Sequence, residues 1–200
     1  MTTMTTMTTM QGSRQVKRGI NPVTVRPIRL GDADAIYAMH KRLLPESLYY
    51  RYLQYRIPPL AEVAALCNMS PEQGAGFVAV THTGCEHIVG VAHYVRDGGQ
   101  HTCAAELAIL VEDRYQGLGI GRSLWQRLHQ HAAADRLCEL RVIFDVRNHR
   151  LLRLIQGSGY LYKPSFDGDL NDYRVVLSEP PQPSRIRRFL GRFVTYPSAS

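Results

Sequence analysis

A strand-like apolar run that passes into a glycine-rich turn constrains this chain most. Residues 104–111 (AAELAILV) form an apolar run of strand length, and only Glu106 interrupts it. Such a run is typical of a strand that is buried on both faces. The turn QGLGIG follows at 116–121, and apolar residues then recur at the helical spacing of Leu124 and Leu128. The stretch therefore predicts a buried strand, a glycine turn and a helix, in that order.

The predicted turn has the properties of an anion site. Glycines let successive backbone N–H groups face one concavity, and the first turn of a helix adds unpaired N–H groups and the positive end of its dipole. A phosphate or pyrophosphate suits such a site. A Walker loop is excluded because Arg122 and Ser123 follow Gly121, and a GxGxxG fingerprint would need glycine at Leu124 or Arg122. On the glycines alone, a plain loop that ends a buried strand stays an alternative.

Composition predicts one domain with two basic ends. A length of 200 residues with 44% hydrophobic residues fits a single globular domain. No apolar stretch approaches the ~20 residues of a membrane-spanning helix, and no signal-peptide core is seen. The four cysteines lack metal-ligand spacing. We therefore expect a cytoplasmic protein without a metal.

The formal charge of +7 equals the seven basic residues of segments 1–20 and 185–200, which contain no acid. The other 17 basic residues are balanced by 17 acidic ones. The middle of the chain is therefore not basic, and no nucleic-acid partner is expected. Oligomeric state cannot be predicted from these features.

Local patterns divide the chain into a low-complexity tail at 1–20 that is expected to be disordered, a folded domain at 21–180 and a basic tail with Pro and Arg at 181–200. Apolar residues in 185–193 share one helical face, which indicates contact with a membrane surface or a partner, or a helix folded back on the domain. The other expected elements are a strand at 23–30, helices from Asp32, Pro45 and Ala61, a hairpin of 77–80 and 88–94, a helix that ends near Arg136, a strand at 139–146, a helix at 148–156, and strands at 160–163 and 173–178.

The pattern from Val111 to Gly121, with Gln116, Gly119 and Gly121 in a Q/R-x-x-G-x-G/A motif, resembles the acyl-CoA loop of the GNAT superfamily of N-acetyltransferases. The resemblance covers about 23–178. It implies an α/β (α+β) GNAT fold, with a mixed, twisted sheet of about seven strands and helices on both faces. It also implies acetyl-CoA as co-substrate. The residues that it assigns to acetyl-CoA are Ile109, Leu110, Val111, Gln116, Gly117, Leu118, Gly119, Ile120, Gly121, Arg122 and Asn148.

Several stretches are similar to the GNAT domains of bacterial protein-lysine acetyltransferases. These stretches are VRPIR at 25–29 with Asp32, LPESLY at 44–49, GVAHYVR at 90–96, Ala105-Glu106, and Asn148 with Leu151. This similarity implies acetyl transfer to the primary amine of a protein lysine. Acetylation of a small amine and a non-catalytic module that senses acyl-CoA are the alternatives.

Glu106 is the candidate general base. An amine is an ammonium ion at neutral pH, so a base must remove its proton, and a backbone N–H can stabilise the oxyanion. Burial in the strand would disfavour the charged form of Glu106, which suits a base near neutral pH. The resemblance places a glutamate base here. An ion pair with Arg96 is the alternative role, and His93 is a lesser candidate base.

The acid that many GNAT enzymes carry is missing from its usual place. A tyrosine is common seven residues after the asparagine of the last helix, and Ile155 stands at that position. Tyr160 is expected to lie in the core. In the helix that begins at Pro45, two of four tyrosines are expected to pack inside, and a wall facing the substrate is the alternative.

Overall fold

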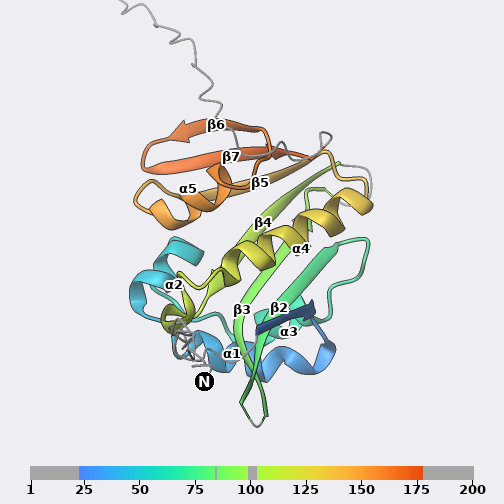
Figure 1. Cartoon of the computed structure of the whole chain (residues 1–200), viewed down its shortest axis with the longest axis vertical. Helices are drawn as coiled ribbons and strands as arrows, with labels where there is room; N and C mark the ends of the chain where they lie inside the picture. The colour runs from blue at the N-terminus through green and yellow to red at the C-terminus, as the bar shows by residue number, and fades with distance from the viewer. Residues whose placement is uncertain (1–22, 84, 99–102, 178–200) are drawn as a thin grey trace, which may run out of the picture.

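One mixed sheet carries the described part of the chain, which is residues 23–83, 85–98 and 103–177 of a computed structural model (Figure 1). Seven strands lie in the order β1-β2-β3-β4-β5-β7-β6. The strands are β1 (Val23–Pro27), β2 (Gly74–Thr83), β3 (Cys85–Arg96), β4 (Ala104–Val111), β5 (Glu139–Asp145), β6 (Tyr162–Asp167) and β7 (Leu170–Val176). The helices are α1 (Ala33–His40), α2 (Pro45–Tyr52), α3 (Leu60–Cys67), α4 (Ile120–Ala134) and α5 (His149–Gln156), with short 3-10 turns at Leu30–Asp32 and Asp113–Tyr115.

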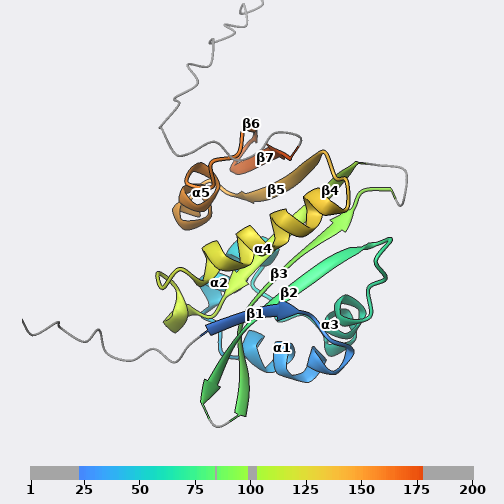
Figure 2. The same ribbon diagram turned by 45° about the vertical axis from the view of Figure 1, so that its right-hand side comes forward.

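The sheet is antiparallel except between β4 and β5, which run parallel. A parallel pair requires a crossover connection, and α4 provides it. β4 and β5 pair only from Ala104↔Glu139 to Glu106↔Arg141. Beyond Glu106 the two strands diverge (Figure 2). The mixed sheet confirms the predicted fold class, and β1 lies at an edge as Pro27 indicated.

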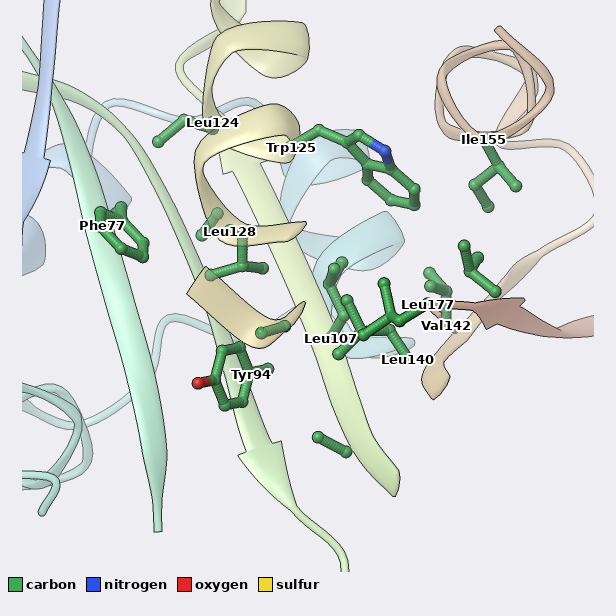
Figure 3. Packing of buried hydrophobic residues seen from close by; sticks show 14 of the residues in the cluster. Phe77, Tyr94, Leu107, Leu124, Trp125, Leu128, Leu140, Val142, Ile155 and Leu177 are labelled. Carbon is green, nitrogen blue, oxygen red and sulfur yellow. The ribbon is translucent and has the colours of Figure 1, made fainter. Parts of the chain in front are cut away.

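Two apolar clusters cover the two faces of the sheet. On one face, α4 and α5 pack Leu128, Trp125 and Ile155 against inward side chains such as Leu107 (Figure 3). On the other face, α1, α2 and α3 cover a cluster that includes Leu110. Strand β4 therefore lies between two layers of helices over most of its length, as its apolar run predicted.

A bulge in β3 decides which side chains of this strand face α1–α3. Ala79 pairs with Gly90 and Val80 pairs with Ile88, so Val89 is skipped in the register. The extra residue shifts the alternation of faces by one position. As a result His93 lies on the α1–α3 face of the sheet, and Tyr94 lies in the α4-face cluster.

Several boundaries differ from the predictions, each for a local reason. Helix α2 ends at Tyr52 because Leu53 adopts a left-handed conformation with φ of 55°. Helix α4 ends at Ala134, before Arg136, which has φ of 59°. The β2–β3 ladder extends to Thr83↔Cys85, so the hairpin is longer than its apolar core. The predicted tails and the apolar face at 185–193 lie outside the described residues.

The packing of α4 can be tested at Leu128, whose side chain is fully buried. We expect Leu128→Ala to lower the free energy of unfolding by about 2–5 kcal/mol, because the truncation leaves a cavity in a closely packed layer. Urea denaturation measures this change. Leu161→Ala is the control, since Leu161 is 38% exposed and should lose far less. Equal losses in the two variants would contradict the described packing.

Candidate active site

The glycine turn is open on its outer side. Gly117 and Gly119 have φ of +77° and +86°, a conformation that favours glycine. A Cβ added at either residue would meet no atom within 4 Å. Within the described chain, the backbone N–H groups of residues 117–122 have no backbone acceptor, whereas Ser123 N–H donates to the Gly119 carbonyl. The turn and the start of α4 therefore present free donors to one open space, which fits a bound anion.

Side chains from three elements hold this turn in place. Gln116 Nε2 donates to the Val111 carbonyl at 2.9 Å and to Ser47 Oγ at 3.3 Å. Arg150 of α5 donates to Gln116 Oε1. Ser47 Oγ donates in turn to Asp113 Oδ1 at 2.6 Å. The sequence motif identified Gln116, but it gave no signal that Ser47 and Arg150 would support it.

The predicted acetyl-CoA residues lie on β4, in the glycine turn, at the start of α4 and at the N-cap of α5. Ile109 and Val111 pack on the α4 face, while Leu110 is buried on the other face. In the described chain, β4 has no ladder partner on its β5 side beyond Glu106. Leu118 and Arg122 are exposed near the turn, and Ile120 is buried. Leu110 and Ile120 can therefore offer only their backbone to a ligand.

Asn148 has a structural role that the motif did not indicate. Its side-chain oxygen accepts a hydrogen bond from the Leu151 N–H at 3.1 Å and so caps the N-terminus of α5. Such a cap satisfies one of the donors that a helix leaves unpaired at its start. The cap fixes the end of α5 that faces the glycine turn through Arg150.

Glu106 lies on the α1–α3 face of β4, but it is exposed, so its predicted burial is wrong. Its cross-strand partner Val95 is 42% exposed, which shows that the helices leave this end of the sheet uncovered. Arg96 pairs with Asp135 at 3.4 Å, which rules out the predicted alternative of a Glu106–Arg96 ion pair. Arg51 and Arg141 act electrostatically on Glu106 without forming an ion pair with it in the described residues.

His93 is a poor proton acceptor in this setting. Arg51 Nη2 donates to His93 Nε2 at 3.3 Å, so that nitrogen is already engaged. Burial lowers the pKa of His93 to about 3, with a further contribution from the Arg51 charge. The imidazole is therefore neutral at physiological pH and has little tendency to take up a proton. Glu106 is the better placed base of the two sequence candidates.

A cavity of about 550 Å³ opens beside Glu106, and sequence reasoning did not predict it. Side chains of α1, α2, α3 and β3 line it, including Arg51, Tyr52 and His93. Val95, the cross-strand partner of Glu106, also lines the cavity. Tyr52 donates to His40 Nε2 at 2.8 Å and packs against the α1–α3 cluster. Tyr49 and Tyr50 are half-buried, and Tyr55 lies beyond the end of α2 and is exposed, so the expected packing of two tyrosines inside is not observed.

The structure also bears on the missing acid. Ile155 is fully buried in the α4-face cluster, so no proton donor stands at that position. Tyr160 packs partly buried against the same cluster, with its ring centroid 4.6 Å from that of His129.

Among the described residues, no group of three or more His, Cys, Asp or Glu is arranged to hold a metal ion. None of the described helices combines the length and apolarity that crossing a bilayer requires.

Comparisons with known proteins agree on one family. The model of the acetyltransferase (GNAT) family matches residues 36–160. Acetyltransferase PA5475 of Pseudomonas aeruginosa is 26% identical over 141 residues, which are 70% of this chain and 75% of that protein. The GNAT domain of S. lividans PAT shares 25% identity at a TM-score of 0.65, over 75% of this chain and 88% of that domain.

A further solved structure supports the fold alone. The structure of yncA from Salmonella typhimurium, which contains acetyl-CoA, is 19% identical with a TM-score of 0.64 and covers 82% of this chain and 99% of its own. The family match spans the glycine turn, β4 and the cavity residues from Ile36 onward. The chain therefore belongs to the GNAT family and is an acetyltransferase that uses acetyl-CoA as its acetyl donor.

Proposed function

We propose that this enzyme acetylates the ε-amine of a protein lysine, with Glu106 as the general base. The exposure of Glu106 carries the proposal. The carboxylate stands at an uncovered end of the sheet, beside the point where β4 and β5 diverge. A side chain that projects from another protein can reach such a position, whereas a small amine would need no open approach. The stretches such as 44–49, which resemble GNAT domains of bacterial protein-lysine acetyltransferases, support the same acceptor class.

The chain supplies the groups that this reaction needs. Acetyl-CoA brings the thioester, whose carbonyl carbon the neutral amine attacks. Glu106 takes the proton from the ammonium ion, directly or through a water. A backbone N–H on the unpaired side of β4 donates to the developing oxyanion. As the C–N bond forms, the C–S bond breaks and the CoA thiolate leaves with the electron pair. The second proton of the attacking nitrogen passes to solvent or to the thiolate. No tyrosine stands at the Ile155 position, so the thiolate, whose basicity is low, leaves without a protein acid there.

We assign the pyrophosphate of acetyl-CoA to the turn at 116–121 and the start of α4. The free N–H groups of residues 117–122 and the helix dipole complement its charge. The pantetheine arm would follow the unpaired side of β4 from Ile109 to Val111, where no strand competes for the backbone. Gln116 contributes mainly by holding the turn, because both ends of its amide are engaged within the protein.

Glu106→Gln tests the base directly. The variant keeps the shape of the side chain and removes its basicity, so we expect turnover on a lysine peptide to fall about 10²–10⁴-fold with nearly constant CoA affinity. Steady-state kinetics and calorimetry measure the two quantities. Glu86→Gln is the control and should keep full turnover. Glu86 lies near the start of β3, whereas Val95, the partner of Glu106, lies near the end of that strand. Near-normal turnover of Glu106→Gln at pH 7 would remove Glu106 from the mechanism.

Gly119→Val tests the turn. The new side chain would project into the open space where the pyrophosphate approaches, so CoA affinity should fall about tenfold or more, since close backbone approach is lost. Gly168→Val is a matched control, because Gly168 also has a positive φ with open space around it and lies in the β6–β7 turn. Both variants carry similar backbone strain. Calorimetry that shows equal CoA affinity in the two folded variants would refute the assignment.

The acceptor class is tested with labelled acetyl-CoA. Incubation of the enzyme with a cell lysate should place the label on protein lysines, as located by mass spectrometry of the digested proteins. Glu106→Gln is the background control in the same lysate. Label confined to the small-molecule fraction would favour the small amine as acceptor instead.

A further inference from the structure

The cavity beside Glu106 contains a cation without an ionic partner. Arg51 lines the cavity, and within the described chain it forms no ion pair. Its contacts are a hydrogen bond to His93 at 3.3 Å and stacking over Tyr52, with its guanidinium carbon 4.7 Å from the ring centroid. Desolvation of a charge is costly unless a counter-ion or hydrogen bonds compensate it. These neutral contacts orient Arg51, while Glu62 and Glu106 act on its charge only through space and form no ion pair with it among the described residues.

The other charged groups that line the cavity do not supply the counter-ion. Glu62 forms a bidentate ion pair with Arg56, whose Nη1 and Nη2 donate to the two carboxylate oxygens at 2.8 and 3.0 Å. Arg96 pairs with Asp135, outside the cavity lining. Burial lowers the pKa values of His40 and His93, so both imidazoles are neutral at physiological pH. Arg51 therefore gives the lining a net positive charge.

The position of Arg51 relates this charge to the reaction. His93 accepts a hydrogen bond from the guanidinium and lies on β3 opposite Ala108. Ala108 follows Glu106 by two residues on β4, so both side chains lie on the same face. Arg51 also acts electrostatically on Glu106. A molecule whose amine meets Glu106 can thus place a second group in the cavity. A planar carboxylate suits that place, because the guanidinium fork binds carboxylates with two parallel hydrogen bonds.

We propose that Arg51 and its cavity recognise a carboxylate on the acceptor, so that the preferred acceptor is a lysine with an acidic residue nearby in its peptide. This inference rests on the proposed lysine acetylation and specifies its substrate class. Arg51 contacts the acceptor away from the reacting amine, and it determines specificity while Glu106 handles the proton. A neutral acceptor can still be acetylated, but it leaves the Arg51 charge unpaired.

The test uses matched lysine peptides. Each peptide carries one Glu at one of the positions that flank the lysine, and its partner carries Gln at the same position. For at least one position, the wild-type enzyme should show a kcat/KM about tenfold or more higher for the Glu peptide, as expected for a hydrogen bond to a charged group. Arg51→Gln should abolish this preference, so that the variant shows the same kcat/KM for the Glu and the Gln peptide. Arg51→Glu should reverse it in favour of a peptide with Arg at that position.

The controls separate three outcomes. Arg127→Gln, an exposed arginine of α4 on the opposite face, should keep the Glu preference. Circular dichroism and the midpoint of urea denaturation report that each variant is folded. Equal kcat/KM for Glu and Gln peptides in the wild type would overturn this inference and leave lysine acetylation in place. Equal loss on both peptides in Arg51→Gln would also overturn it, because Arg51 would then act through Glu106. Failure of every lysine peptide, with lysate protein also unlabelled, would overturn the proposed function and this inference together.

Discussion

The early end of the β4–β5 ladder is the constraint on which the rest of this structure depends. The parallel strands pair over three positions and then separate, which leaves one side of β4 without a strand partner in the described part of the chain. Unpaired backbone donors and acceptors are costly inside a protein unless water or a ligand satisfies them. Here they lie along the second half of β4, where β4 and β5 diverge, so a ligand with amide groups can complete the ladder.

The two halves of the candidate site lie on different faces of the sheet. Helix α4 lies on one side of the sheet and α1 and α3 lie on the other (Figure 2). The glycine turn leads into α4, while Glu106 and the cavity lie on the α1–α3 side. Alternation along β4 separates them, because successive side chains point to opposite faces. Glu106 thus points away from α4 although it stands in the strand that leads to the turn. A donor bound on the α4 side and an acceptor on the α1–α3 side would meet through the gap.

The sequence was informative where local physics decides the structure. The apolar run predicted β4 with its observed bounds, and the glycines predicted a turn with positive φ angles before α4. It was misleading about Glu106, because an apolar strand says nothing about where its covering helices stop. The ladder between β4 and β5 and the bulge at Val89 depend on partners far away in the chain, so no local pattern revealed them. The cavity arises from four elements and could not be predicted from any one of them.

The surroundings of Arg51 could not be predicted from the sequence, because the fold creates them. In the sequence it lies between two tyrosines of an amphipathic helix, where an arginine on the solvated face is the ordinary expectation. The fold turns it toward His93, and burial lowers the pKa of its guanidinium. Its contacts with His93 and Tyr52 offset this desolvation only in part, and a bound carboxylate would add an ion pair. The same desolvation that makes an unpaired arginine costly makes its pairing with a carboxylate strong and selective.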